Sequence, residues 1–210
     1  MNNTLITFGL ALFLLTACQD RGGDYDQVKN PERVVTISDD HLNMIVEIPA
    51  GTNHKIEYDY GNEAFLNDKN ADGSTRVINF LPYPGNYGFI PGTLMDTLRG
   101  GDGDALDVLV IAESAPTGSR IPVKPIAALL LRDRGEIDTK IIAVPADPTR
   151  QVLAAKDFLD FAINYDAARN IIESWFLNYK GPGQTELIRW EDENYAWDEV
   201  RKWKIDEEGK

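Results

Sequence analysis

The feature that most constrains this chain is an acidic hexapeptide that runs directly into an apolar stretch. Asp102, Asp104 and Asp107 fall within six residues, and the apolar run 108–111 follows at once. Like charges held this close raise one another's pKa unless a cation neutralises them. A regular strand would direct Asp107 to the opposite face from the other two, whereas Gly103 lets the backbone bend. The pattern predicts a loop that converges three carboxylates at the start of a buried strand.

Carboxylates at this density are typical ligands of divalent cations. Hard oxygen ligands suit Mg2+ or Mn2+, and bound divalent cations suit phosphoryl chemistry. A calcium-binding EF-hand loop beginning at Asp102 is excluded, because its sixth position would be Asp107 instead of glycine. The segment 68–73 fits the opening of such a loop better, but its twelfth position is Asn79 and no helical pattern flanks it. That segment is interpreted as a polar hairpin turn built on an Asp-Gly pair.

Length, charge and residue types limit the classes of function. A chain of 210 residues predicts one domain with a substantial core. The formal net charge of -13 argues against nucleic acid or an acidic membrane as a partner of the folded surface. The only histidines are His41 and His54, and the chain has neither a nucleophile elbow nor a Walker motif. A serine hydrolase, a Walker-type nucleotide site and a zinc site with Cys or His ligands are therefore not expected.

The N-terminal residues resemble the signal of a bacterial lipoprotein. Residues 1–17 carry no charged side chain, and 5–15 form an apolar run too short to span a bilayer comfortably. The tetrapeptide that ends at Cys18, Leu-Thr-Ala-Cys, resembles a lipobox, which implies cleavage before this cysteine, its lipidation and a membrane anchor. The usual Lys or Arg near the start is absent, so an ordinary hydrophobic tail is the alternative.

Three segments follow from this interpretation. They are a signal peptide at 1–17, a lipidated cysteine and flexible tether at 18–33, and a folded domain at 34–210. Since Cys18 is the only cysteine, no internal disulfide and no cysteine nucleophile are expected in the domain. The predicted location is that of an exported lipoprotein, anchored to a membrane and facing the periplasm or the cell exterior.

Strand patterns come first along the domain and helix patterns later. Alternation and short apolar runs predict strands at 44–48, 55–60, 108–111, 126–131 and 137–144. Apolar residues at three- and four-residue steps predict one or two amphipathic helices over 158–179, and 192–205 is expected to form a last helix. This order predicts an α+β fold, with an antiparallel sheet or small barrel and helices packed on one side.

Several short motifs occur in one order along the chain. They are Ile-Val-Glu-Ile-Pro at 45–49, Lys-Ile-Glu-Tyr at 55–58, Tyr-Pro-Gly-Asn-Tyr-Gly-Phe-Ile at 83–90, Asp-Gly-Asp-Ala-Leu-Asp-Val-Leu-Val at 102–110, Asp133 with Asp138 and Lys140, and Tyr-Lys at 179–180. The ordered set, over roughly residues 34–205, resembles the soluble family I inorganic pyrophosphatases of bacteria, whose signature is Asp-x-Asp-x-x-Asp-Val. The resemblance implies a five-stranded OB-type β-barrel with helices packed outside it, and Mg2+-dependent hydrolysis of pyrophosphate to two phosphates.

The same resemblance implies a role for each matching residue. Asp104 would be the general base on the attacking water, although on its own it could equally be a further metal ligand. The metal ions would be held by Asp102, Asp107, Asp138, Asp133 and Glu47. The phosphate oxygens would be held by Lys55, Arg76, Tyr87, Lys140, Tyr179 and Lys180. Glu57 would have a supporting role.

Two departures from the family pattern concern the substrate cations. Arg76 aligns only with a small gap before the motif at 83–90, so Arg99 is the alternative phosphate arginine. Family members often carry a further lysine shortly after the Tyr-Lys pair, whereas segment 181–185 is short and lysine-free. One phosphate contact is therefore missing or replaced by Arg189, and weaker substrate binding is expected.

The expected cofactor is Mg2+, several ions per site, with Mn2+ as a substitute. Pyrophosphate brings several negative charges to carboxylates, and only a cluster of divalent cations makes that assembly favourable. The expected partners are pyrophosphate, a membrane through the lipid anchor on Cys18, no nucleic acid and, from the resemblance, further copies in a homo-oligomer. Two alternatives remain: another metal-dependent phosphohydrolase acting on polyphosphate or nucleotides, and a non-catalytic metal-binding lipoprotein with an OB-like barrel.

Overall fold

A computed structural model describes residues 25–38 and 40–205. The expected signal peptide, Cys18 and the first part of the tether lie outside the described residues. The strands are β1 (Asp26–Gln27), β2 (Ile37–Ser38), β3 (His41–Ile48), β4 (Ile56–Asp59), β5 (Ala64–Asn67), β6 (Asn86–Phe89), β7 (Asp107–Val110), β8 (Ser119–Asp133), β9 (Glu136–Pro145) and β10 (Thr185–Glu191). The helices are α1 (Phe158–Asn164), α2 (Asp166–Asn178) and α3 (Glu193–Trp203), and the 3-10 turns are η1 (Pro31–Arg33), η2 (Thr97–Arg99) and η3 (Pro148–Arg150).

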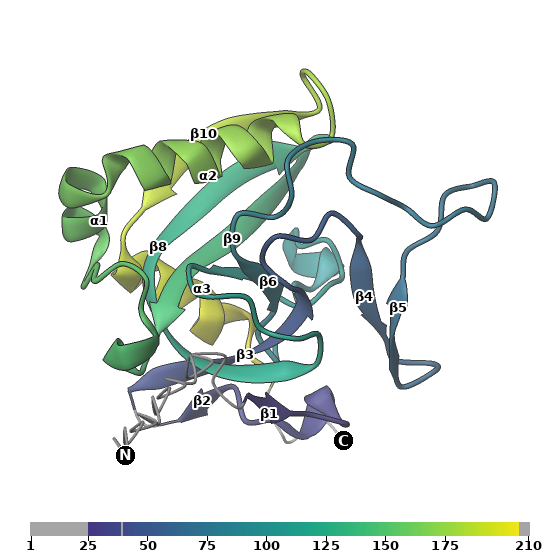
Figure 1. Cartoon of the computed structure of the whole chain (residues 1–210), viewed down its shortest axis with the longest axis horizontal. Helices are drawn as coiled ribbons and strands as arrows, with labels where there is room; N and C mark the ends of the chain where they lie inside the picture. Colours follow the sequence, from purple (N-terminus) through teal and green to yellow (C-terminus); the bar gives the residue numbers. More distant parts are fainter. Residues whose placement is uncertain (1–24, 39, 206–210) are drawn as a thin grey trace, which may run out of the picture.

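Most strands belong to one mixed sheet. β8, β9, β7, β6 and β3 pair in succession, and β3 pairs again with β8, so the path of pairings returns to its first strand. β7 and β9 are parallel, which corrects the expected antiparallel sheet. β1 and β10 extend the sheet beside β8, and β2 extends it beside β3. The hairpin β4–β5 is separate and projects from the side of the molecule opposite α1 (Figure 1).

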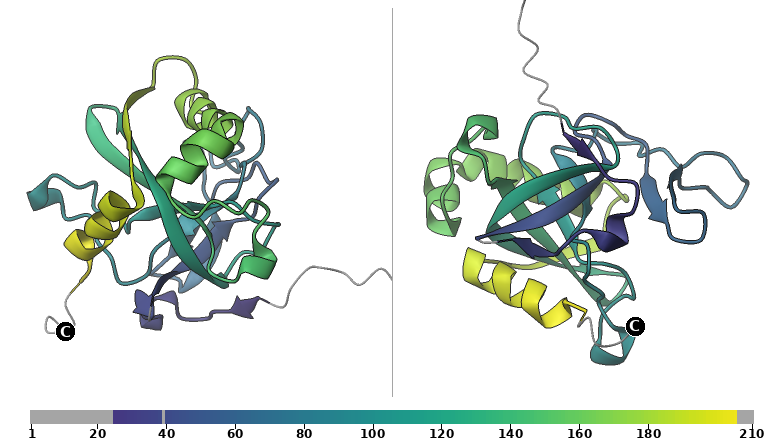
Figure 2. Two further views of the ribbon diagram at one scale, coloured as in Figure 1. Left: turned by 90° about the vertical axis from the view of Figure 1, so that its left-hand side faces the viewer. Right: turned by 90° about the horizontal axis from the view of Figure 1, so that it is seen from below.

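The sheet buries apolar side chains on both faces, because successive residues of a strand point in opposite directions. Val108 and Ile141 pack in the cluster that contains Trp203 of α3. Their neighbours Leu109 and Ile142 pack in the cluster that contains residues of α1 and α2, namely Phe161, Trp175 and Phe176. Figure 2 shows α3 on one side of the sheet and α1 and α2 on the other. The expectation of helices on one side was wrong, since strands that are apolar at every position need cover on both faces.

The expected elements are present with adjusted bounds. The five predicted strands correspond to β3, β4, β7, β8 and β9, and the helical stretch divides at Tyr165 into α1 and α2. α3 begins after Asp192, whose side chain accepts a hydrogen bond from the Tyr195 N–H at 2.9 Å and caps the helix. The turn at 68–73 is also confirmed, because Gly73 N donates to Asn70 O at 2.9 Å.

Several shorter strands were not expected from the sequence. β10 was missed because it lies at an edge and its pairing with β8 is interrupted by a bulge between Leu187 and Arg189, which breaks the alternation of apolar residues. Among the described residues, no helix has the length and apolar character needed to cross a membrane.

Candidate active site

One cavity of about 350 Å³ collects the residues that the sequence pointed to. It is lined by the end of β3, the start of β7, the β8–β9 hairpin and the segment that follows α2. Every expected site residue that the structure describes contributes to its wall: Glu47, Lys55, Glu57, Arg76, Tyr87, Asp102, Asp104, Asp107, Asp133, Asp138, Lys140, Tyr179 and Lys180. Segments distant in the sequence therefore meet around a single space.

Glu47 is directed into the cavity by an irregularity in strand pairing. β3 and β6 slip by one residue at Glu47, and such a bulge redirects the side chain. This slip in register requires glycine at position 88 of β6, because a Cβ at Gly88 would lie 1.9 Å from the carbonyl oxygen of Ile45. Glu47 accepts a hydrogen bond from Tyr58 N at 2.8 Å. Burial raises the pKa of the Glu47 carboxyl to about 7, against the opposing effect of this hydrogen bond.

The acidic loop bends as the sequence predicted. Gly103 has φ +92°, in the left-handed region that favours glycine. Asp102 Oδ1 accepts a hydrogen bond from Asp104 N at 3.0 Å, and Leu106 N donates to Thr93 Oγ1 at 2.9 Å. Burial and the neighbouring carboxylates raise the pKa values of Asp102 and Asp104. The loop thus brings like charges together at an electrostatic cost.

A buried lysine lies between two of the carboxylates. Asp107 and Lys140 are direct partners in the parallel pairing of β7 with β9. Lys140 Nζ forms an ion pair with Asp107 and another with Asp138, whose Oδ1 is 2.6 Å away. The lysine side chain is only 5% exposed. Burial alone would lower the pKa of Lys140, but Asp107 and Asp138 outweigh that effect and hold the pKa well above its usual value.

The segment after α2 supplies a second lysine. Lys180 Nζ lies 2.5 Å from Asp133 Oδ2. The preceding Tyr179 stacks on Trp175 with ring centroids 4.4 Å apart, which fixes its position at the end of the helix. Asp133 Oδ1 is buried and has no hydrogen-bond partner in the described part of the chain. A buried carboxylate oxygen normally accepts a hydrogen bond or contacts a cation, so Asp133 Oδ1 lacks an expected partner.

The structure distinguishes the two candidate phosphate arginines. Arg76 lines the cavity beside Lys55, because Lys55 N donates to Arg76 O at 3.3 Å. The Arg76 guanidinium contacts Asp68 Oδ2 at 2.8 Å, and Lys55 forms an ion pair with Glu57. Arg99 instead donates to Lys202 O at 3.1 Å and lies over the ring of Trp203, outside the cavity wall.

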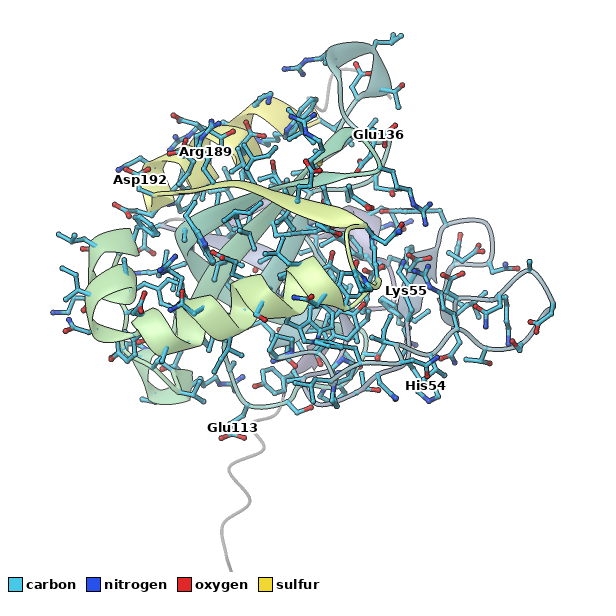
Figure 3. The ribbon with its side chains drawn as sticks, turned by 90° about the horizontal axis from the view of Figure 1, so that it is seen from above. His54, Lys55, Glu113, Glu136, Arg189 and Asp192 are labelled. Atoms are coloured by element: carbon cyan, nitrogen blue, oxygen red, sulfur yellow. The ribbon has the colours of Figure 1, made fainter. Side chains whose placement is uncertain are left out.

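Of the two alternatives given for the missing lysine, replacement by Arg189 does not agree with the structure, because Arg189 does not line the cavity. β10 places it opposite Leu130, three residues along β8 from the cavity residue Asp133. Its Nε donates to Glu191 Oε1 at 2.5 Å. Figure 3 shows Arg189 near Asp192, well apart from Lys55. Because β10 runs away from the β8–β9 turn, Arg189 lies farther from the cavity than Thr185 does.

Three polar cavity residues, Tyr83, Arg134 and Glu136, were absent from the expected site. Tyr83 is buried beside Tyr87 and Trp175, with ring centroids 5.4 and 4.5 Å away. Arg134 and Glu136 come from the β8–β9 hairpin. A signal for these two was present, because a hairpin whose two shoulders carry site carboxylates must place its turn near the same site.

The residues present fit divalent cations chemically. Eight carboxylates line the cavity, among them the five expected metal ligands, and the buried Asp133 Oδ1 has no partner among the described residues. Oxygen donors of this kind suit Mg2+. No group of three or more His, Cys, Asp or Glu side chains among the described residues stands ready to hold a metal ion. Lys140 and Lys180 contact the carboxylates in this arrangement, so cation binding would require these side chains to move.

Carboxylates, lysines, arginines and tyrosines line the cavity. Such a mixture suits the binding of a phosphate-bearing anion together with cations. The sequence matches the family model described as inorganic pyrophosphatase over residues 44–206, so the chain belongs to the inorganic pyrophosphatase family.

Individual relatives agree with this assignment. The chain is 41% identical over 144 residues to the inorganic pyrophosphatase of Sulfolobus acidocaldarius, covering 67% of this chain and 75% of the relative. It is 34% identical over 183 residues to that of Haemophilus influenzae, covering 85% and 94%. The crystal structure of the inorganic pyrophosphatase from Thermus thermophilus superposes with a TM-score of 0.69 at 29% identity, covering 82% of this chain and 95% of that one.

Proposed function

We propose that the cavity performs the hydrolysis of pyrophosphate to two phosphates, so that the chain is an inorganic diphosphatase. The observation that carries this proposal is the single cavity lined by every described residue expected to serve the reaction. Membership of the inorganic pyrophosphatase family supports pyrophosphate as the substrate.

Asp102, Asp107, Asp138, Asp133 and Glu47 are the residues that would hold several Mg2+ ions, or Mn2+ as a substitute. When bound, such ions neutralise the anionic assembly and lower the pKa of a water toward neutrality. The unpartnered Asp133 Oδ1 supports this role, because a cation would supply the missing contact.

Asp104 is the proposed general base. Its carboxylate makes no hydrogen bond or ion pair with the described residues, whereas Asp107, Asp138 and Asp133 each contact a lysine. It is therefore available to accept the proton of the water that attacks one phosphorus in line. Its place at the tip of the loop, two residues beyond Asp102, keeps it beside the carboxylates without engaging it in their ion pairs.

The cations and tyrosines of the cavity would hold the two phosphate groups. Arg76 offers a forked donor, and Lys55, Lys140 and Lys180 offer point charges. Tyr87 and Tyr179 add hydroxyl donors without adding charge. Glu57, which pairs with Lys55, would support that lysine's position.

Phosphate release from pyrophosphate in Mg2+, compared with release from tripolyphosphate and ATP, tests the function. We expect pyrophosphate to be preferred. Preference for tripolyphosphate or ATP would support a different phosphohydrolase, and divalent-ion binding without phosphate release would support a non-catalytic binding protein.

A membrane-anchored form is proposed from the N-terminal sequence. Residues 1–17 would be a signal peptide, Cys18 the lipidated residue, 18–33 its tether and 34–210 the enzyme domain, facing the periplasm or the cell exterior. The apolar run and the tetrapeptide that ends at Cys18 support this proposal. Cys18→Ser should shift the protein from the membrane fraction to the soluble fraction, and an unchanged distribution would contradict the anchor.

A closed OB-type barrel and a homo-oligomer are also proposed. The cycle of pairings through β8, β9, β7, β6 and β3 supports the barrel. Leu159, Ile163 and Ile171 are large apolar side chains exposed on α1 and α2, and such side chains favour contact with another protein surface. Sedimentation velocity should report more than one copy, and Leu159→Glu with Ile163→Glu should reduce that number.

A further inference from the structure

One basic side chain of the cavity differs from all the others. Five basic residues line the cavity, and four of them, Lys55, Arg76, Lys140 and Lys180, are paired with carboxylates. The fifth, Arg134, forms no hydrogen bond or ion pair with any residue that the structure describes. An unpaired guanidinium at the wall of an anion site is available to a ligand.

The backbone at Arg134 is also unusual. Arg134 and Gly135 form the two-residue turn between Asp133 and Glu136, with φ values of +51° and +96°. Hairpin turns with two positive φ values favour Asn, Asp or Gly at the first position, and a long side chain there is uncommon. An unfavoured residue held in such a turn supports a functional role for its side chain.

Strand pairing places this turn beside the lysine-free segment that follows Lys180. Asp133 is opposite Thr185 of β10 as well as opposite Glu136 of β9. The turn 134–135 therefore adjoins the chain that enters β10, where segment 181–184 offers no cation. The positive charge at this edge of the cavity is that of Arg134, in the turn between β8 and β9.

We propose that Arg134 binds a phosphate group of pyrophosphate at the edge of the cavity, a role that rests on the proposed function. The guanidinium presents a planar fork of N–H donors that matches phosphate oxygens. Arg134 does not need to give up a carboxylate partner to do so, unlike the other cations of the cavity. It acts in substrate binding and not in proton transfer.

Kinetics of Arg134→Asn test this role, because Asn tolerates positive φ and removes only the cation. We expect KM for pyrophosphate in Mg2+ to rise about tenfold, as for one lost charge-assisted hydrogen bond, while kcat changes by less than about twofold. Arg132→Asn is the matched control, since Arg132 does not line the cavity and its Nη1 donates to Gly135 O at 3.3 Å, so this variant reports the effect of loosening the turn without removing Arg134. Arg134→Lys should recover part of the lost affinity.

Equal KM values for Arg134→Asn and Arg132→Asn would overturn the proposal. A fall in kcat and in melting temperature at unchanged KM would also overturn it, because that result describes a structural role. If the unsubstituted protein released no phosphate from pyrophosphate, the proposed function itself would fail.

A second measurement uses the unsubstituted chain and does not depend on turnover. Phenylglyoxal modifies accessible arginines, and peptide mass spectrometry reports each position separately. Methylenediphosphonate, a non-hydrolysable diphosphate, should slow modification of Arg134 in the presence of Mg2+ while modification of Arg132 stays unchanged. Equal modification of Arg134 with and without this diphosphonate would contradict the proposal.

Discussion

Lys140 illustrates how a single buried side chain holds an acidic site together. Its ammonium contacts Asp107 and Asp138, and all three groups are mostly removed from water. Buried charges are tolerated when they are paired, whereas removal of one partner leaves the other charge uncompensated. The lysine therefore has a structural effect in addition to its proposed contact with phosphate.

Lys140→Met should destabilise the protein in EDTA by about 3 kcal/mol, because two carboxylates lose their buried partner. Mg2+ should restore more stability to this variant than to the unsubstituted protein, since a cation can occupy the position of the ammonium. Thermal melts with EDTA and with Mg2+ measure both effects. Lys124→Met is the control, because its ion pair with Asp40 is exposed and should contribute little. Equal melting temperatures of Lys140→Met and Lys124→Met in EDTA would contradict this account.

Asp104→Asn should reduce kcat by roughly a hundredfold or more, as expected for loss of a general base. Metal binding should remain, because Asp102, Asp107 and Asp138 are retained. Asp107→Asn should instead raise the Mg2+ concentration needed for half-maximal activity. Phosphate release measured across a Mg2+ titration separates the two variants. Turnover of Asp104→Asn close to that of the unsubstituted protein would show that the base assignment is wrong.

The bulge between β3 and β6 is the element that makes Glu47 part of the site. A regular pairing would alternate strictly, and Glu47 would not be displaced from the register of its neighbours. Gly88 permits the bulge because the strands approach too closely there for any side chain. The bulge therefore determines where Glu47, a candidate metal ligand, lies.

Gly88→Ala should destabilise the protein by more than about 2 kcal/mol and reduce activity, because the added Cβ meets backbone that cannot move cheaply. Gly61→Ala is a suitable control, since a Cβ there would meet only the Asp59 carboxylate at 3.3 Å. Chemical denaturation and phosphate release report the two effects. The explanation would be refuted by wild-type stability and activity in Gly88→Ala.

The molecule as a whole brings its carboxylates together from three separate parts of the chain. Glu47 lies one residue before the end of β3, the acidic loop leads into β7, and Asp133 and Asp138 flank the β8–β9 turn. A ligand that binds all three parts stabilises the folded state, because the unfolded chain cannot offer them together.

Mg2+ at a hundred times its dissociation constant should stabilise the protein by about 2.7 kcal/mol relative to EDTA. Asp138→Asn should diminish this gain, while Asp198→Asn, on the exposed face of α3, should leave it intact. Differential scanning calorimetry is the appropriate measurement. A gain from Mg2+ that is the same in both variants would argue against cation binding in the cavity.

Much of the site could be predicted because the reaction demands particular residue types in one chain order. The carboxylates and lysines of the ordered motifs all line the cavity, as do their tyrosines except Tyr58. The apolar run 108–111 and the periodic segment 158–179 also form the expected elements. β10 and β6 were less predictable, because short strands with polar or irregular patterns owe their pairing to neighbours distant in the sequence.

The sequence by itself therefore determined which groups are available, the order in which they occur and the family to which they belong. Only the tertiary structure decided which cations reach the cavity: Arg76 and not Arg99, Arg134 and not Arg189. The reason is that strand register, bulges and hairpin turns set the direction of each side chain. These depend on contacts between residues far apart in the chain, which local sequence patterns do not specify.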